Sequence, residues 1–220
     1  MSAPKLEILP TAQRRLWNEL RETPQEFVLY GGTGLASRLG HRTSEDFDFF
    51  SNRPFSPDVL RKTIGYLAEA EMRQFEQNTL TAIVDREGPV KVSFFGGLNL
   101  NRVQDPDVIP ENGVKLASLL DIAATELATI QQRAPARDYE DLLALADAGV
   151  SLSESLAAAE AVYGSTFNGA LSLKALTFFA DGDLPTLSPL IQSRLRALAG
   201  QVNLEQVPVM RARIGVTGAA

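Results

Sequence analysis

The chain has no cysteine and only one histidine, His41. Without cysteine there is no disulfide bond, no thiolate metal site and no cysteine nucleophile. A single histidine excludes a zinc site that needs two or three imidazoles. Two large classes of site, those built on thiols and those built on clustered histidines, are therefore excluded.

Long apolar runs are also lacking, since no segment approaches the roughly 20 residues that a membrane-spanning helix needs. The first ten residues, MSAPKLEILP, contain no apolar signal core. The net charge of -6 argues against a broad basic surface for nonspecific binding to nucleic acid or membrane. With 220 residues, 45% of them hydrophobic, the chain can bury a real core. We expect a soluble cytoplasmic protein with no membrane partner.

The hydrophobic periodicity changes near residues 101–114, where RVQDPDVIPENG is rich in turn formers. Before that point, helix and strand patterns alternate. They predict a helix over 6–21, strands at 26–30 and 46–50, helices over 34–40 and 56–71, and a hairpin of strands at 79–85 and 90–95.

After that point, leucine and alanine recur at helical spacing in five segments. They predict helices within 115–133, 136–149, 151–164, 167–180 and 188–200. Among the aromatic residues of this half, Tyr163, Phe178 and Phe179 are expected in the core. The sequence therefore predicts an α+β first part and a helical second part.

The segment DFDFF places Asp46 and Asp48 two residues apart on a predicted strand. Residues i and i+2 of a strand point to the same side, so the two carboxylates share one face. Phe47 and Phe49 then point the other way, into a core. Two carboxylates on rigid backbone suit magnesium, which takes one or two carboxylates together with phosphate oxygens. Taken alone, the same pattern also fits a solvated strand face.

Upstream, Gly31, Gly32 and Gly34 follow a predicted strand and begin a helix, and Thr33 adds a hydroxyl. Free N–H groups at the start of a helix bind anions such as phosphate. The segment GGTGLASRLG is not a P-loop, because no lysine is followed by serine or threonine. A dinucleotide-binding fingerprint from Gly32 has Ser37 in place of its third glycine, and it stays only a weak alternative for the fold.

These residues resemble the family of AbiEii-type abortive-infection toxins, which are nucleotidyltransferases of the DNA polymerase β-like superfamily. The resemblance rests on GGTGLASRLGHRTSEDFDFF, VKVSFF, DIAATELATIQQRAPARDYEDLLAL and LSLKALTFFADGD. It implies a minimal polymerase β-like sheet with flanking helices over 1–105 and a helical domain over 106–220. It also implies Mg²⁺, a nucleoside triphosphate substrate, an RNA acceptor such as the 3′ end of transfer RNA, and an antitoxin partner.

The resemblance also assigns roles to individual residues. Gly31, Gly32 and Thr33 form the phosphate-binding turn, and Arg42 and Lys91 are placed to meet phosphate. Asp46 and Asp48 are the metal ligands. Asp138 matches the acid of the family's Lys/Arg–Asp–x–x–Asp element and is the candidate catalytic base or substrate-positioning acid, with Asp141 on the same helix face.

The sequence departs from the family pattern at two positions. Ser93 stands where a third acid is usual, and Glu126 stands where a lysine is common. The first change removes a metal ligand, and the second puts an anion where a cation would meet triphosphate. Two functions therefore remain open. The first is a magnesium-dependent nucleotidyltransferase, and the alternative is a catalytically degenerate relative that binds a nucleotide or a partner.

Overall fold

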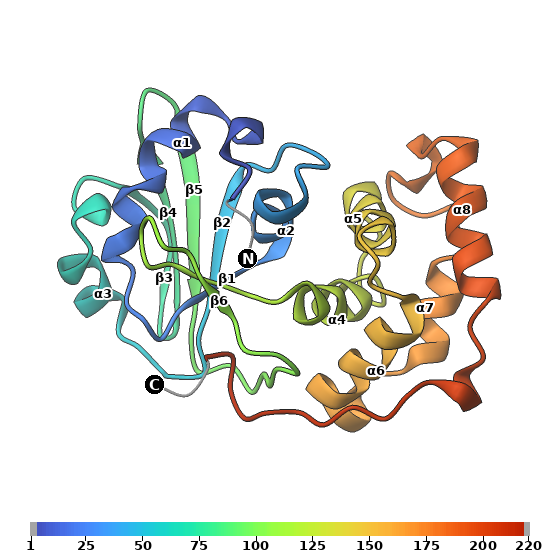
Figure 1. The fold of residues 1–220 in the computed structure, drawn as a ribbon. Helices are drawn as coiled ribbons and strands as arrows, with labels where there is room; N and C mark the ends of the chain where they lie inside the picture. The colour runs from blue at the N-terminus through green and yellow to red at the C-terminus, as the bar shows by residue number, and fades with distance from the viewer. Residues whose placement is uncertain (1–3, 218–220) are drawn as a thin grey trace. The chain divides into compact units, whose positions relative to one another are not determined.

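A computed structural model describes residues 4–217 of the chain (Figure 1). Its contacts divide the chain into two compact units. Unit 1 comprises Met1–Leu100, Asp105–Ser118 and Gly215–Ala220, and unit 2 comprises Asn101–Gln104 and Leu119–Ile214. The predicted assignment of a catalytic core to 1–105 and a completing domain to 106–220 stays a prediction.

Unit 1 is built on a seven-stranded sheet with the order β3-β4-β5-β2-β1-β7-β6. Its central strand β2 pairs antiparallel with β1 and parallel with β5. The strands are β1 (Val28–Tyr30), β2 (Asp46–Phe50), β3 (Glu71–Glu76), β4 (Thr79–Asp85), β5 (Pro89–Phe95), β6 (Asp107–Val108) and β7 (Lys115–Leu116). The predicted α+β class is confirmed, and so are the strands at β1, β2, β4 and β5.

The helices of unit 1 are shorter than predicted. They are α1 (Thr11–Trp17), α2 (Gly31–Leu39) and α3 (Pro57–Thr63). The single helix expected over 6–21 is wrong, because Leu9 precedes Pro10 and is extended, with ψ 142°. A residue before proline disfavours the helical region, so the chain breaks there into short helical pieces. The helix expected over 56–71 likewise ends at Thr63, and β3 begins at Glu71.

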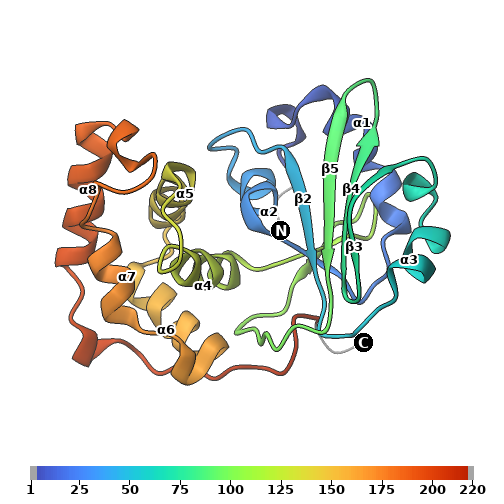
Figure 2. The same ribbon diagram turned by 180° about the vertical axis from the view of Figure 1, so that it is seen from behind.

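The core of unit 1 lies between the sheet and the helices α1 and α3. Figures 1 and 2 show these two helices on one side of the sheet and α2 on the other. Phe47 and Phe49 of β2 are fully buried, and the ring of Trp17 on α1 lies 6.1 Å from that of Phe47. The opposite face of β2, which carries its two aspartates, is therefore the face on the side of α2.

Unit 2 contains the predicted helices of the second half. They are α4 (Leu119–Thr129), α5 (Ala136–Asp147), α6 (Leu152–Tyr163), α7 (Gly169–Ala175) and α8 (Pro189–Gly200). Helix α4 packs against α5 and α6, and α5 packs against α8. Phe179 is buried as expected, but the core prediction is wrong for Phe178, which is 49% exposed. The helix α7 ends before these two residues, so Phe178 lies outside the helical pattern that suggested burial.

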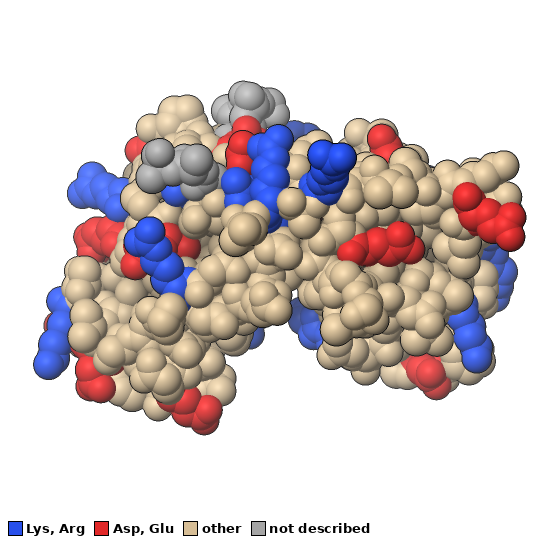
Figure 3. All heavy atoms as spheres, turned by 90° about the horizontal axis from the view of Figure 1, so that it is seen from below, with Lys and Arg blue, Asp and Glu red and all other residues tan. Residues whose placement is uncertain are grey.

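The surface carries charges of both signs. On the face drawn in Figure 3, lysine and arginine side chains are interspersed with aspartate and glutamate side chains. This face therefore mixes both signs of charge. Within residues 4–217, no single helix is long and apolar enough to cross a membrane. One pair of helices, Ala136–Asp147 and Leu152–Thr166, reaches the necessary length and hydropathy only when the two are counted together, and it is bent by 115°.

Two glycines provide a test of the packing in this fold. A Cβ atom at Gly96 would lie 2.8 Å from the backbone oxygen of Arg53, whereas a Cβ at Gly200 would meet nothing within 4 Å. We expect Gly96→Ala to lower the free energy of unfolding by about 1–3 kcal/mol, because the backbone must shift. Gly200→Ala should leave it unchanged or raise it by about 0.5–1 kcal/mol. Urea unfolding measures both, and equal effects would contradict the packing described at Gly96.

Candidate functional site

The two aspartates of β2 lie beside a lysine and a serine of β5. In the parallel register, Asp46 is opposite Lys91 and Asp48 is opposite Ser93. The ammonium of Lys91 donates a hydrogen bond to Oδ2 of Asp46 over 2.8 Å. Both aspartates are half-buried on the same face of the sheet. Both predicted metal ligands therefore lie on one face of β2, and the protein itself places a cation at Asp46.

The turn between β1 and α2 brings Asp48 and Arg42 against its glycines. Gly31 has φ +65°, a conformation that favours glycine, and a Cβ there would lie 3.3 Å from Oδ2 of Asp48. A Cβ at Gly32 would lie 2.6 Å from Nη2 of Arg42 and 3.0 Å from Oγ of Ser44. No other residue fits at Gly32 without displacing the guanidinium. An acid and a cation thus lie directly against the start of α2.

Thr33, the third residue of α2, has a buried hydroxyl. The residue is 1% exposed, and among the described residues its Oγ1 has no hydrogen-bond partner. Leaving a buried polar group unsatisfied costs about 1–3 kcal/mol. The hydroxyl of Ser37, one turn later, instead donates to the backbone oxygen of Gly34 over 2.9 Å. An oxyanion bound at the start of α2 is a ligand that the Thr33 hydroxyl could satisfy.

Ser93 occupies the strand position where the family usually has a third acid. It lies opposite Asp48 in the register of β2 and β5, and its equivalence to the family's third acid stays a prediction. The side chain is 1% exposed, and its Oγ accepts a long hydrogen bond of 3.4 Å from Thr81 of β4. The hydroxyl is therefore held within the sheet by the neighbouring strand. It adds no negative charge beside the two aspartates.

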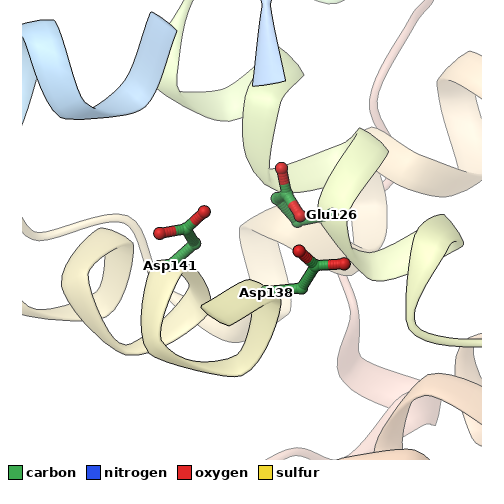
Figure 4. A group of neighbouring side chains, drawn as sticks. All are labelled: Glu126, Asp138 and Asp141. Carbon is green, nitrogen blue, oxygen red and sulfur yellow. The ribbon is translucent and has the colours of Figure 1, made fainter. Parts of the chain in front are cut away.

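Unit 2 contains a second acidic group, which we call the acidic triad: Glu126 of α4 with Asp138 and Asp141 of α5 (Figure 4). Their exposed fractions are only 7%, 4% and 1%. One carboxylate oxygen from each lies within 4.8 Å of the others. Oxygen ligands this close suit a hard divalent cation, because magnesium and calcium both take several carboxylate oxygens. The donor set of the triad therefore fits a metal ion.

Positive charge reaches the triad at Asp138. Nη2 of Arg133 lies 3.3 Å from Oδ2 of Asp138, and Nε of Arg137 lies 3.8 Å from Oδ1. Both arginine side chains are more than half exposed, at 57% and 58%. Burial, together with the charge of Glu126, raises the pKa of Tyr163 to about 12. The negative potential of the triad thus extends to a neighbouring helix.

The sequence predicted Asp138 and Asp141 on one helix face but missed the part that Glu126 plays beside them. Glu126 was treated only as a departure from a family lysine. One signal was available, because Glu126 interrupts the otherwise uncharged run IAATEL, and all six residues are buried. A charged residue is almost never fully buried unless it is paired, so its position indicated a partner.

Comparison with known proteins bears on the family of this chain. The family model described as "Nucleotidyl transferase AbiEii toxin, Type IV TA system" matches residues 15–210. An uncharacterized protein of Aquifex aeolicus (strain VF5) is 33% identical over 119 residues. That match covers 53% of this chain and 56% of the relative. The chain therefore spans little more than half the length of that protein.

Two solved structures are also similar. The first, "Crystal structure of putative nucleotidyltransferase from H. pylori", is 19% identical and covers 89% of this chain and 94% of its own, with a TM-score of 0.56. An antigenic nucleotidyltransferase-like protein from Paracoccidioides brasiliensis is 17% identical over 90% of this chain and 94% of its own, with a TM-score of 0.47. At such low identity, the first of these likenesses shows a shared fold. The extent of the family match shows that the chain belongs to the AbiEii nucleotidyl transferase toxin family of type IV toxin–antitoxin systems.

Proposed function

We propose that the protein is a magnesium-dependent nucleotidyltransferase that transfers a nucleotide from a nucleoside triphosphate to a hydroxyl group of RNA. The observation that carries this proposal is the turn at the start of α2. There, Asp48 and Arg42 lie against Gly31 and Gly32, and the buried hydroxyl of Thr33 has no partner among the described residues. Free N–H groups, a cation and a carboxylate in one place suit a phosphate bound together with a metal ion.

The residues of unit 1 would bind and orient the triphosphate. The backbone N–H groups at the start of α2 and the Thr33 hydroxyl donate hydrogen bonds to phosphate oxygens. Arg42 and Lys91 supply positive charge, and Asp46 and Asp48 are the ligands for Mg²⁺. When bound, the metal ion neutralises charge that develops on the phosphates during transfer.

The reaction is a displacement at the α-phosphorus. The oxygen of an acceptor hydroxyl forms a bond to that phosphorus, and the bond to the bridging oxygen breaks, so that pyrophosphate leaves. We propose that the carboxylate of Asp138 accepts the proton of the acceptor hydroxyl. Two grounds support this assignment: Asp138 belongs to the family's Asp–x–x–Asp element, and its side chain is buried, at 4% exposed. A positioned base of this kind contributes about 10²–10⁴-fold to the rate.

The RNA acceptor and the antitoxin stay predictions from the family resemblance. The family takes its name from toxins of type IV toxin–antitoxin systems, which supports an antitoxin that counteracts this protein. The base of the triphosphate and the RNA that accepts it are left to experiment.

A second candidate function is nucleotide binding without transfer. It is favoured by Ser93, which supplies a hydroxyl bonded to Thr81 where the family usually has an acid, and by Glu126, which adds a third buried carboxylate to the triad. Calorimetry with magnesium and each triphosphate, combined with a transfer assay on bulk RNA, separates the two functions. Binding without any transfer would favour this second function.

The first prediction concerns the metal ligands. Asp46→Asn should reduce transfer of an α-labelled nucleotide to RNA by about 10²–10³-fold, because one charged ligand is lost. Glu45→Gln is the matched control, since Glu45 precedes Asp46 but its side chain is exposed. It should keep wild-type transfer. Equal rates for the two variants would contradict the role of Asp46.

The second prediction concerns the buried hydroxyl. Thr33→Val keeps the shape of the side chain and removes the hydroxyl, so triphosphate binding should weaken about 5–10-fold for one lost hydrogen bond. The free energy of unfolding should not fall, because no hydrogen bond within the protein is broken. The control, Ser37→Ala, breaks a buried hydrogen bond in the same helix and should lower stability without changing affinity. The reverse pattern would assign the Thr33 hydroxyl a structural role.

The third prediction separates binding from chemistry. Asp138→Asn should reduce transfer by about 10²–10⁴-fold, as expected for loss of a general base. Triphosphate affinity, measured by calorimetry with magnesium, should stay within about twofold of wild type. Glu140→Gln, on the same helix and only partly buried, is the control and should transfer normally. If Asp138→Asn also transfers normally while remaining folded, Asp138 is not the base.

A further inference from the structure

Unit 2 contains a small pocket of about 210 Å³ that the proposed function does not yet use. Its walls come from the end of α4, from α5, and from α7 with the segment that follows it. The residues on which its chemistry depends are Ile130, Tyr139, Leu171, Lys174, Phe178 and Asp181. Pockets for drug-sized ligands occupy about 300–1,000 Å³, so this one has room for a single flat ring rather than a whole triphosphate.

The pocket presents apolar surface to solvent. Phe178 is 49% exposed and Leu171 is 50% exposed, although both are large apolar side chains. Tyr139 contributes a second aromatic ring and is buried, at 1% exposed. Exposed aromatic surface in a concave site is suited to stacking against a planar ligand.

Polar groups at the same pocket suit a nucleobase with its phosphate. Asp181 is an exposed carboxylate that can accept a hydrogen bond from an exocyclic amino group, and Lys174 is an exposed ammonium that can meet phosphate. Burial and the charges of Asp138 and Asp181 raise the pKa of Tyr139 to about 12.

The pocket is tied to the proposed catalytic base by the turn after α4. A Cβ at Gly182 would lie 2.8 Å from the backbone oxygen of Ala134, so the segment bearing Asp181 packs on that turn. Oδ1 of Asp183 also accepts a hydrogen bond of 2.7 Å from the N–H of Ala136. The same turn carries Arg133, which reaches Asp138 at 3.3 Å. The pocket and Asp138 therefore share one rigid neighbourhood within unit 2.

Exposed cations lie near this pocket. Arg133, Arg137 and Lys174 are exposed cations on the turn, on α5 and on α7, and Asp181 is the exposed acid that lines the pocket. We propose that this pocket binds one base of a single-stranded RNA acceptor, stacked on Phe178, with the adjoining phosphates at Lys174 and Arg133. Because Asp181 accepts from an amino group, cytosine and adenine should bind better than uracil. The proposal rests on the proposed function for RNA as the substrate.

The test measures RNA binding by the full chain without triphosphate. Fluorescence anisotropy with short labelled oligocytidylate should show about tenfold weaker binding for Phe178→Ala, since one stacked base contributes roughly that factor. Phe75→Ala is the matched control, because Phe75 is an aromatic side chain of unit 1 that is 40% exposed. Lys174→Gln should reduce the slope of log affinity against log salt concentration by about one, the contribution of a single phosphate contact. Asp181→Asn should narrow the preference for cytosine over uracil.

Two results would overturn the proposal. One is equal binding by Phe178→Ala and Phe75→Ala, which is also the result expected if a protein partner occupies the pocket. The other is wild-type binding to an abasic ribose-phosphate oligomer that is as tight as binding to oligocytidylate. Because no nucleotide is transferred in this assay, its outcome is independent of catalysis. If Phe178→Ala loses RNA binding, the pocket is supported as an RNA site even when no transfer is detected. If Phe178→Ala transfers normally and binds RNA as tightly as wild type, only the proposed role of the pocket is overturned.

Discussion

The alternation of β2 is the constraint on which the candidate site of unit 1 depends. Phe47 and Phe49 are fully buried, and burying each ring contributes about 1.5–3 kcal/mol. A shift of one residue in the register would turn both rings to the other face and place Asp46 and Asp48 in the apolar core. The cost of burying unpaired carboxylates excludes that register. The packing that folds the strand therefore also fixes the two acids on the opposite face, beside Lys91 and Ser93.

The glycines at the start of α2 are needed for the same arrangement. Gly31 has φ +65°, where any other residue is strained, whereas Gly32 costs the helix about 0.5–1 kcal/mol relative to alanine. What they allow is close approach, because Oδ2 of Asp48 and Nη2 of Arg42 occupy the space that side chains would fill. The local loss of helix stability is thus coupled to a site where an acid, a cation and free N–H groups meet.

Local patterns predicted the parts of the fold that local physics determines. The alternation in DFDFF, the hairpin at 79–95 and the C-terminal glycine of α2, Gly40 with φ +67°, all follow from periodicity and backbone preference. Strand β3 was missed because EMRQFE is exposed along most of its length and lacks an apolar face. The association of Glu126 with Asp138 was missed for a different reason. It depends on the packing of α4 against α5, and the spacing within either helix does not contain that information.

The acidic triad of unit 2 contacts two arginines at Asp138. Hydrogen bonds between an arginine and a carboxylate are usually about 2.7–2.9 Å long, whereas Arg133 and Arg137 stay 3.3 Å and 3.8 Å from Asp138. Their side chains are also more than half exposed, so solvent weakens both contacts. Burial, together with the charges of Asp138 and Asp181 at Tyr139 and of Glu126 at Tyr163, raises the pKa of both tyrosines to about 12. Because both contacts are long and exposed, an anion that competes for either arginine displaces little interaction energy with Asp138.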